Sequence, residues 1–227
     1  MTNQESDIFD LIIRGGTVID GTRRPRFDAD VGIRNGRIAE IGDLRARTAV
    51  KIIDATGKIV APGFIDSHTH DDAAVLFDPQ MICKISQGVT TVVTGNCGIS
   101  LAPLGPDAPH PMPLSLLTGD EHAPCATFSR FADYLDAVRR SPSSVNVAAM
   151  VGHTTLRVMT MDSLDRAASA GEIEAMQGLL NEACVFRGSW TRVSREGGQV
   201  FRAKLDSRSA ATQGFSVFTL TAGFRSN

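Results

Sequence analysis

Long apolar runs are missing from this chain of 227 residues. No stretch approaches the roughly 20 apolar residues that a membrane-spanning helix requires. The polar residues 1–7 also lack the basic and apolar segments of a secretion signal. We therefore expect no membrane partner and a cytoplasmic location.

Basic clusters and closely spaced cysteines are also missing. The net charge is -2 and no run of Lys or Arg stands out, which argues against a nucleic-acid partner. No Cys-x-x-Cys pair occurs, so a disulfide framework is not expected. Hydrophobic residues at 42% and charged residues at 21% are ordinary values for a soluble globular protein, which argues against disorder.

Residues 10–60 alternate short apolar runs with turn signals. Asn35-Gly36 between two such runs predicts a hairpin, because a type I′ turn requires positive φ at both central positions. We expect a small antiparallel, β-sandwich-like domain over residues 1–61. Taken alone, this stretch is equally compatible with a β-hairpin domain of any function.

After residue 61 the pattern changes to strand-like runs that alternate with amphipathic segments, which is typical of an α/β fold with a parallel sheet or barrel. Strands are predicted over residues 63–66, 88–94 and 145–151, and helices over 128–140 and 170–184. We assign residues 62–185 to a partial (β/α) barrel.

Two histidines, His68 and His70, follow the first predicted strand of this second domain. Active sites of such barrels lie at the carboxyl ends of the strands, and residues two apart project to the same side. The pair therefore suits a metal ion, although a His-x-His pair by itself is also compatible with a structural role. Asp66 and Asp71 add carboxylates that could orient the imidazoles, whereas Asp72 is expected to face solvent.

Residues 11–20 and 52–70 resemble the opening β strands and the entry to the metal site of the amidohydrolase superfamily. Gly-Asn-Cys-Gly at residues 95–98 and Gly-His-Thr-Thr-Leu-Arg at residues 152–157 are similar to the D-aminoacylase branch. The resemblance extends roughly over residues 9–185. It implies a zinc-dependent (Zn2+) hydrolase that deacylates N-acyl-D-amino acids, with a small-molecule substrate.

The resemblance also implies the metal ligands. Cys97 corresponds to a zinc ligand of the D-aminoacylases, whereas hydantoinase-like relatives use a carboxylated lysine later in the barrel. The expected metal ligands are His68, His70 and Cys97. Read without the resemblance, Cys97 is more typical of a small buried residue than of a metal ligand. His153 and Arg157 are candidates for substrate binding, since a guanidinium can hold a carboxylate, although Arg157 could instead pair with a local acid.

A complete barrel needs about 250 residues, so the resemblance predicts a truncated barrel without the later histidines and the general-base aspartate. The tail at residues 186–227 is atypical. The codons of residues 186–191, read one nucleotide later, permit Ser-Gly-Ala-Leu-Gly-Leu, which resembles the family's fourth strand, so we hypothesise a frameshift near Val185. The alternative is a natural, divergent C-terminal segment. We therefore expect an incomplete, inactive fragment of a deacylase. Two alternatives stay open: a cyclic-amide hydrolase of the hydantoinase or dihydroorotase type, and a non-catalytic fragment.

Overall fold

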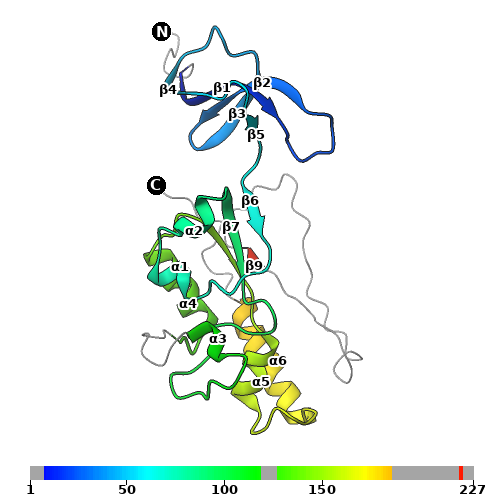
Figure 1. Ribbon diagram of the computed structural model, residues 1–227. Coiled ribbons are helices and arrows are strands. Elements are labelled where there is room, and N and C mark those ends of the chain that lie inside the picture. The colour runs from blue at the N-terminus through cyan, green and yellow to red at the C-terminus, as the bar shows by residue number, and fades with distance from the viewer. Residues whose placement is uncertain (1–7, 119–126, 186–219, 222–227) are drawn as a thin grey trace. The chain divides into compact units, whose positions relative to one another are not determined.

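The computed structural model describes residues 8–118, 127–185 and 220–221 (Figure 1). The chain divides into two compact units between Gly63 and Phe64, two residues after the boundary expected from the sequence. The predicted tail at residues 186–227 lies outside the described residues, except for one short strand. The frameshift hypothesis concerns residues that are not described.

The first unit is built on one mixed sheet. Its strands are β1 (Phe9–Val18), β2 (Phe27–Arg34), β3 (Arg37–Gly42), β4 (Ala49–Asp54) and β5 (Ile59–Val60). The strand order is β3-β2-β1-β4, and β5 also pairs with β1. The predicted hairpin is present, because Asn35 and Gly36 between β2 and β3 both have positive φ, 52° and 67°.

The expectation of an antiparallel unit is correct for β1–β2 and β2–β3 but wrong for β4 and β5, which run parallel to β1. Residues 43–48 lead from β3 to β4, and Leu44 within them is buried against Phe9 and Ile12. The Leu44 amide donates to Asp30 Oδ2 at 3.0 Å, which fixes the connection. This apolar anchor favours a crossover over a second hairpin.

The second unit has a mixed α/β fold, as expected. Its strands are β6 (Phe64–Asp66), β7 (Val89–Thr94), β8 (Asn146–Ala149) and β9 (Leu220–Thr221). Its helices are α1 (Ala74–Phe77), α2 (Ile82–Ile85), α3 (Ser115–Thr118), α4 (Phe131–Arg140), α5 (His153–Thr160) and α6 (Ala170–Val185). The sheet order is β6-β7-β8-β9, with β6, β7 and β8 parallel and β9 antiparallel to β8.

One apolar core lies between the strands and the helices of the second unit. Val92 of β7 and Val147 of β8 belong to it, together with Tyr134, Leu135 and Val138 of α4. These helix positions share one face at the 3.6-residue period, so the predicted amphipathic helix packs as expected. The parallel pairing of β6 with β7 contains a register irregularity between Phe64 and Ile65.

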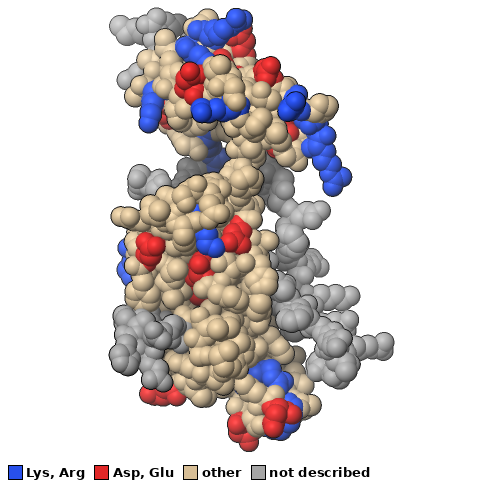
Figure 2. All heavy atoms as spheres, viewed as in Figure 1, with Lys and Arg blue, Asp and Glu red and all other residues tan. Residues whose placement is uncertain are grey.

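Charged side chains of both signs are mixed over the first unit on the face shown in Figure 2. The second unit carries fewer charges on that face. Among the described residues, no helix combines the length and apolar character that crossing a membrane requires.

Candidate metal centre

His68 and His70 follow β6, and Cys97 follows the neighbouring parallel strand β7. Because parallel strands end at the same edge of a sheet, the two segments meet there. The imidazole nitrogens and the thiol sulfur all lie within 4.8 Å of one another, and the described residues contain no other such cluster of three or more His, Cys, Asp or Glu. His68 Nε2 lies 2.7 Å from Cys97 Sγ. The three side chains are exposed, so Cys97 is not a buried packing residue.

This donor set fits zinc. Two imidazoles and a thiolate are ligands that zinc prefers, at about 2.0–2.1 Å for nitrogen and about 2.3 Å for sulfur. Ligand atoms around one tetrahedral ion then stand roughly 3.3–3.8 Å apart. The separations in the structure, 2.7 Å between His68 Nε2 and Cys97 Sγ and within 4.8 Å for the whole set, bracket these values.

Cys97 sits in a turn with an unusual backbone. Gly95, Cys97 and Gly98 all have positive φ, 81°, 55° and 77°. The side-chain Nδ2 of the intervening Asn96 donates to Ser67 O at 3.2 Å and to Val93 O at 2.8 Å. The Asn96 side chain therefore joins the segment after β6, next to His68, to the end of β7, close to Cys97.

The left-handed conformation of Cys97 leads to a stability prediction. A residue with a Cβ atom loses about 1–2 kcal/mol in this conformation relative to glycine. We expect the variant Cys97→Gly to be more stable than Cys97→Ala by about 1 kcal/mol, measured as the free energy of unfolding in urea. The two variants both lack the thiol, so the comparison isolates the backbone effect. Equal stabilities would show that the turn relaxes without strain.

The Cys97 turn is held against the start of α5 by buried hydrogen bonds. Thr154 N donates to Gly98 O at 2.6 Å, and Ser100 N donates to Thr155 Oγ1 at 2.8 Å. Gly152 N donates to Ser100 Oγ at 2.9 Å. Because Ser100 and Thr155 are buried, these bonds are shielded from competing water, and the turn has a fixed position relative to β8 and α5.

Asp72 corrects one expectation from the sequence, because it is buried, with 1% exposure, and does not face solvent. Its Oδ2 accepts a hydrogen bond from Gly95 N at 3.3 Å, and its carbonyl accepts one from the buried Tyr134 hydroxyl at 3.1 Å. Burial raises the pKa of Asp72 to about 7, although the hydrogen bond from Gly95 acts in the opposite direction. Burial likewise raises the pKa of Tyr134. Asp72 thus ties the segment after His70 to the Cys97 turn.

Asp66 and Asp71 stand on either side of the histidine pair and share Lys84 of α2, with Nζ–O distances of 2.7 and 2.8 Å. The hydrogen bond from Lys84 lowers the pKa of Asp66. Burial alone would lower the pKa of Lys84, but the two carboxylates outweigh it and the pKa rises. Sequence reasoning missed Lys84 and Asn96. For Lys84 the available signal was a single charge within the apolar run of residues 81–85.

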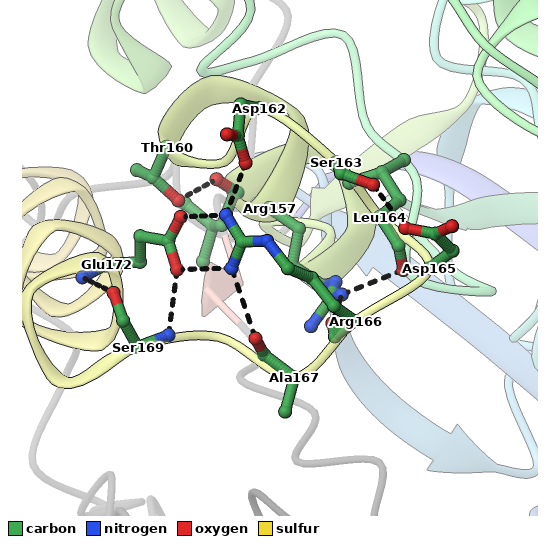
Figure 3. Close-up of polar contacts among 11 residues, drawn as sticks. Arg157, Thr160, Asp162, Ser163, Leu164, Asp165, Arg166, Ala167, Ser169 and Glu172 are labelled. Carbon is green, nitrogen blue, oxygen red and sulfur yellow. Dashed lines mark hydrogen bonds and ion pairs between the residues drawn. The ribbon is translucent and has the colours of Figure 1, made fainter.

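His153 is the first residue of α5, the helix that follows β8 after residues 150–152, and is exposed. Partial shielding of its ring from water lowers the pKa of His153, and the nearby Arg157 guanidinium lowers it further. Arg157 Nη2 donates to two carbonyls, of Leu164 at 2.9 Å and of Arg166 at 2.8 Å (Figure 3). Among the residues that the structure describes, Arg157 therefore bonds to carbonyl oxygens and not to a local acid, the alternative that the sequence left open. Substrate binding by His153 and Arg157 stays a prediction.

A second arginine, Arg166, also fixes the loop at residues 162–169 that Arg157 contacts. Arg166 forms ion pairs with Glu172 at 2.6 Å and with Asp162 (Figure 3). The hydrogen bond from Arg166 lowers the pKa of Glu172 to about 2, and Glu172 Oε2 also accepts from Ser169 N at 2.7 Å. These contacts fix residues 162–169 between α5 and α6, so the role of this arginine pair in the structure is to hold a loop.

The carboxyl ends of these parallel strands thus carry a His-x-His pair and a cysteine, a donor set that suits a bound metal ion. The chain belongs to the amidohydrolase family, whose model matches residues 51–221. D-aminoacylase from Alcaligenes xylosoxydans xylosoxydans is 55% identical over 183 residues, which cover 81% of this chain and 37% of that protein.

Solved structures agree with this assignment. A crystal structure of D-aminoacylase matches with a TM-score of 0.72 and 58% sequence identity. The match covers 77% of this chain and 36% of the D-aminoacylase chain. N-acyl-D-glutamate deacylase from Bordetella bronchiseptica, solved with zinc and a phosphonate inhibitor, has a TM-score of 0.68 and 45% identity over the same shares. The resemblance to D-aminoacylases is confirmed. The chain spans about a third of the length of these relatives.

Proposed function

We propose that this chain carries part of the active site of a zinc-dependent hydrolase that removes the acyl group from N-acyl-D-amino acids. The observation that carries the proposal is the convergence of His68, His70 and Cys97 at one edge of the sheet. The relatives that this chain is similar to include a D-aminoacylase and an N-acyl-D-glutamate deacylase. We further infer that β6, β7 and β8 are the first strands of a (β/α) barrel.

His68, His70 and Cys97 would be the zinc ligands that this chain supplies. Bound zinc supplies Lewis-acid polarisation of the scissile carbonyl and activation of water in hydrolases of this kind. His153 stands at the end of the next strand, on the helix whose first turn binds the Cys97 turn. We propose that it faces the substrate. Arg157 could take the substrate carboxylate only by releasing its two carbonyls.

The role of Cys97 favours a deacylase over a cyclic-amide hydrolase of the hydantoinase type. By the resemblance, hydantoinases use a carboxylated lysine later in the barrel instead of this thiolate, and the thiol here lies beside His68. In a reducing cytoplasm, the location that we propose, the thiol stays free to bind metal. The general base and the remaining ligands are not among the residues that the resemblance identifies here, so we expect metal binding without deacylation by these 227 residues alone.

Cobalt titration of the purified chain tests the metal site. We expect Co2+ to produce a thiolate-to-cobalt charge-transfer absorption that Zn2+ then abolishes, because zinc displaces cobalt from such sites. Cys97→Ser should remove this absorption. His68→Ala or His70→Ala should weaken metal binding by more than about 100-fold, because losing a ligand costs more affinity than losing a residue that only supports a ligand.

Cys83→Ser is the matched control, because Cys83 is a free, exposed cysteine of the same unit. It should leave the cobalt spectrum unchanged. Retention of the absorption in Cys97→Ser would contradict the site. Assays with N-acyl-D-amino acids and with cyclic amides then separate the remaining readings: turnover of a cyclic amide alone would favour the hydantoinase type, and absence of both metal binding and turnover a non-catalytic fragment.

A further inference from the structure

We propose that Lys84 is a positioning residue that fixes the His68-Thr69-His70 segment for metal binding, an inference that rests on the proposed metal site. Its Nζ lies 2.7 Å from Asp66 Oδ2, 2.8 Å from Asp71 Oδ2 and 3.1 Å from Thr69 Oγ1. These three partners stand before, between and after the two histidines. One ammonium group therefore fastens the ligand segment at three points.

The partners of Lys84 transmit this constraint to the backbone. Asp66 Oδ1 accepts a hydrogen bond from His68 N at 3.3 Å, and the Thr69 hydroxyl donates to Asp71 Oδ2 at 2.6 Å. Thr69 is buried, with 8% exposure, so its side chain points away from the exposed imidazoles on either side. With the side chains of residues 66, 69 and 71 held inward, the two histidines project outward together.

Lys84 comes from a different element, α2, and is not a neighbour of the histidines along the chain. The side chains of Lys84 and Asp71 are 19% exposed and that of Asp66 is 28% exposed. Removing the ammonium leaves two partly buried carboxylates without a counter-charge, and such uncompensated charges are strongly unfavourable. We expect Asp66 and Asp71 then to turn toward water and to carry the histidine segment with them.

Two effects of Lys84 on metal affinity have opposite signs, which makes the inference testable. A positive charge close to a cation site weakens metal binding by Coulomb repulsion, so its removal alone would strengthen binding. Loss of the fixed ligand geometry weakens binding. Mutating a residue that supports metal ligands typically lowers metal affinity about 10- to 100-fold. We therefore expect the loss of ligand geometry to outweigh the loss of charge repulsion.

The experiment is Co2+ titration of the full chain, followed by the charge-transfer absorption. We expect Lys84→Met to bind Co2+ about 10- to 100-fold more weakly than the unmodified chain. Lys84→Arg, which can also bridge two carboxylates, should recover most of the affinity. Lys51→Met removes an exposed lysine of the other unit and should change nothing. Unchanged or tighter binding by Lys84→Met overturns the proposal.

A milder variant covers the possibility that Lys84→Met does not fold, which circular dichroism detects. Asp71→Asn keeps the ion pair between Lys84 and Asp66 and removes only the second anchor, so we expect a smaller but measurable loss of affinity. Affinity equal to that of the unmodified chain contradicts the proposal. If the unmodified chain gives no charge-transfer absorption at all, the metal site itself is wrong, and that result is distinct from a failure of the Lys84 variants alone.

Discussion

Gly95→Ala is expected to lower the free energy of unfolding of the second unit by roughly 3–5 kcal/mol, through a left-handed backbone and a steric clash that add together. Gly95 has φ of 81°, and a Cβ atom there would lie 2.1 Å from Met150 O and 2.7 Å from Met150 C. These are backbone atoms of the neighbouring strand segment, so no rotation of a side chain removes the clash. The measurement is urea unfolding followed by circular dichroism.

Gly88→Ala is the matched control for this prediction. Gly88 precedes β7 as Gly95 follows it, and its φ of 80° is nearly the same. The contacts of its added Cβ are ordinary ones, 3.4 and 3.5 Å from the Phe64 ring. Gly88→Ala should therefore cost only the left-handed term of about 1–2 kcal/mol. Equal costs for the two variants would mean that β7 and β8 separate easily at the Cys97 turn.

Asp72→Asn should change how stability depends on pH. A carboxyl group whose pKa is 3.8 in the unfolded chain and about 7 in the folded chain stabilises the fold fully only below pH 3.8. This contribution is lost as the pH rises, and by pH 8 the loss amounts to about 4 kcal/mol. The variant lacks the titration, so between pH 4 and pH 8 its stability should rise by about that amount relative to the unmodified chain.

This comparison does not depend on how well an amide fits the buried site. Any steric or hydrogen-bonding cost of the asparagine is present at both pH values and cancels in the difference. Asp107→Asn, at an exposed carboxylate of the same unit, should show parallel stability curves. Parallel curves for Asp72→Asn as well would show that Asp72 is ionised in the folded protein, with water or a cation close to it.

Several elements of the fold were predictable because local pattern and tertiary environment agree. The β-branched run of β7 lies between two other parallel strands, where such residues pack well, and α4 follows the helical period of its apolar residues. The short helices α1, α2 and α3, of four residues each, were not predicted. Helices of this length have little stability of their own, so tertiary contacts decide whether they form.

The three candidate ligands were predictable for a different reason. His68, His70 and Cys97 each lie shortly after a strand, so strand order brings them to one edge of the sheet, and the resemblance to the D-aminoacylases identified Cys97 as a ligand. Their supporting residues were not predictable in this way. The burial of Asp72 depends on α4 covering it, and the position of Lys84 depends on where a four-residue helix ends. Neither fact can be predicted from the residues next to Asp72 or Lys84 in the sequence.

The pairing of β6 with β7, irregular between Phe64 and Ile65, limits which changes in β6 are compatible with the metal site. Side chains alternate between the faces of a strand, so lengthening or shortening β6 by one residue would rotate the imidazoles to the opposite face. The thiol on β7 would not move with them. Substitutions of the exposed Phe64 and Ile65 are thus compatible with the site, whereas insertions and deletions in this strand are not.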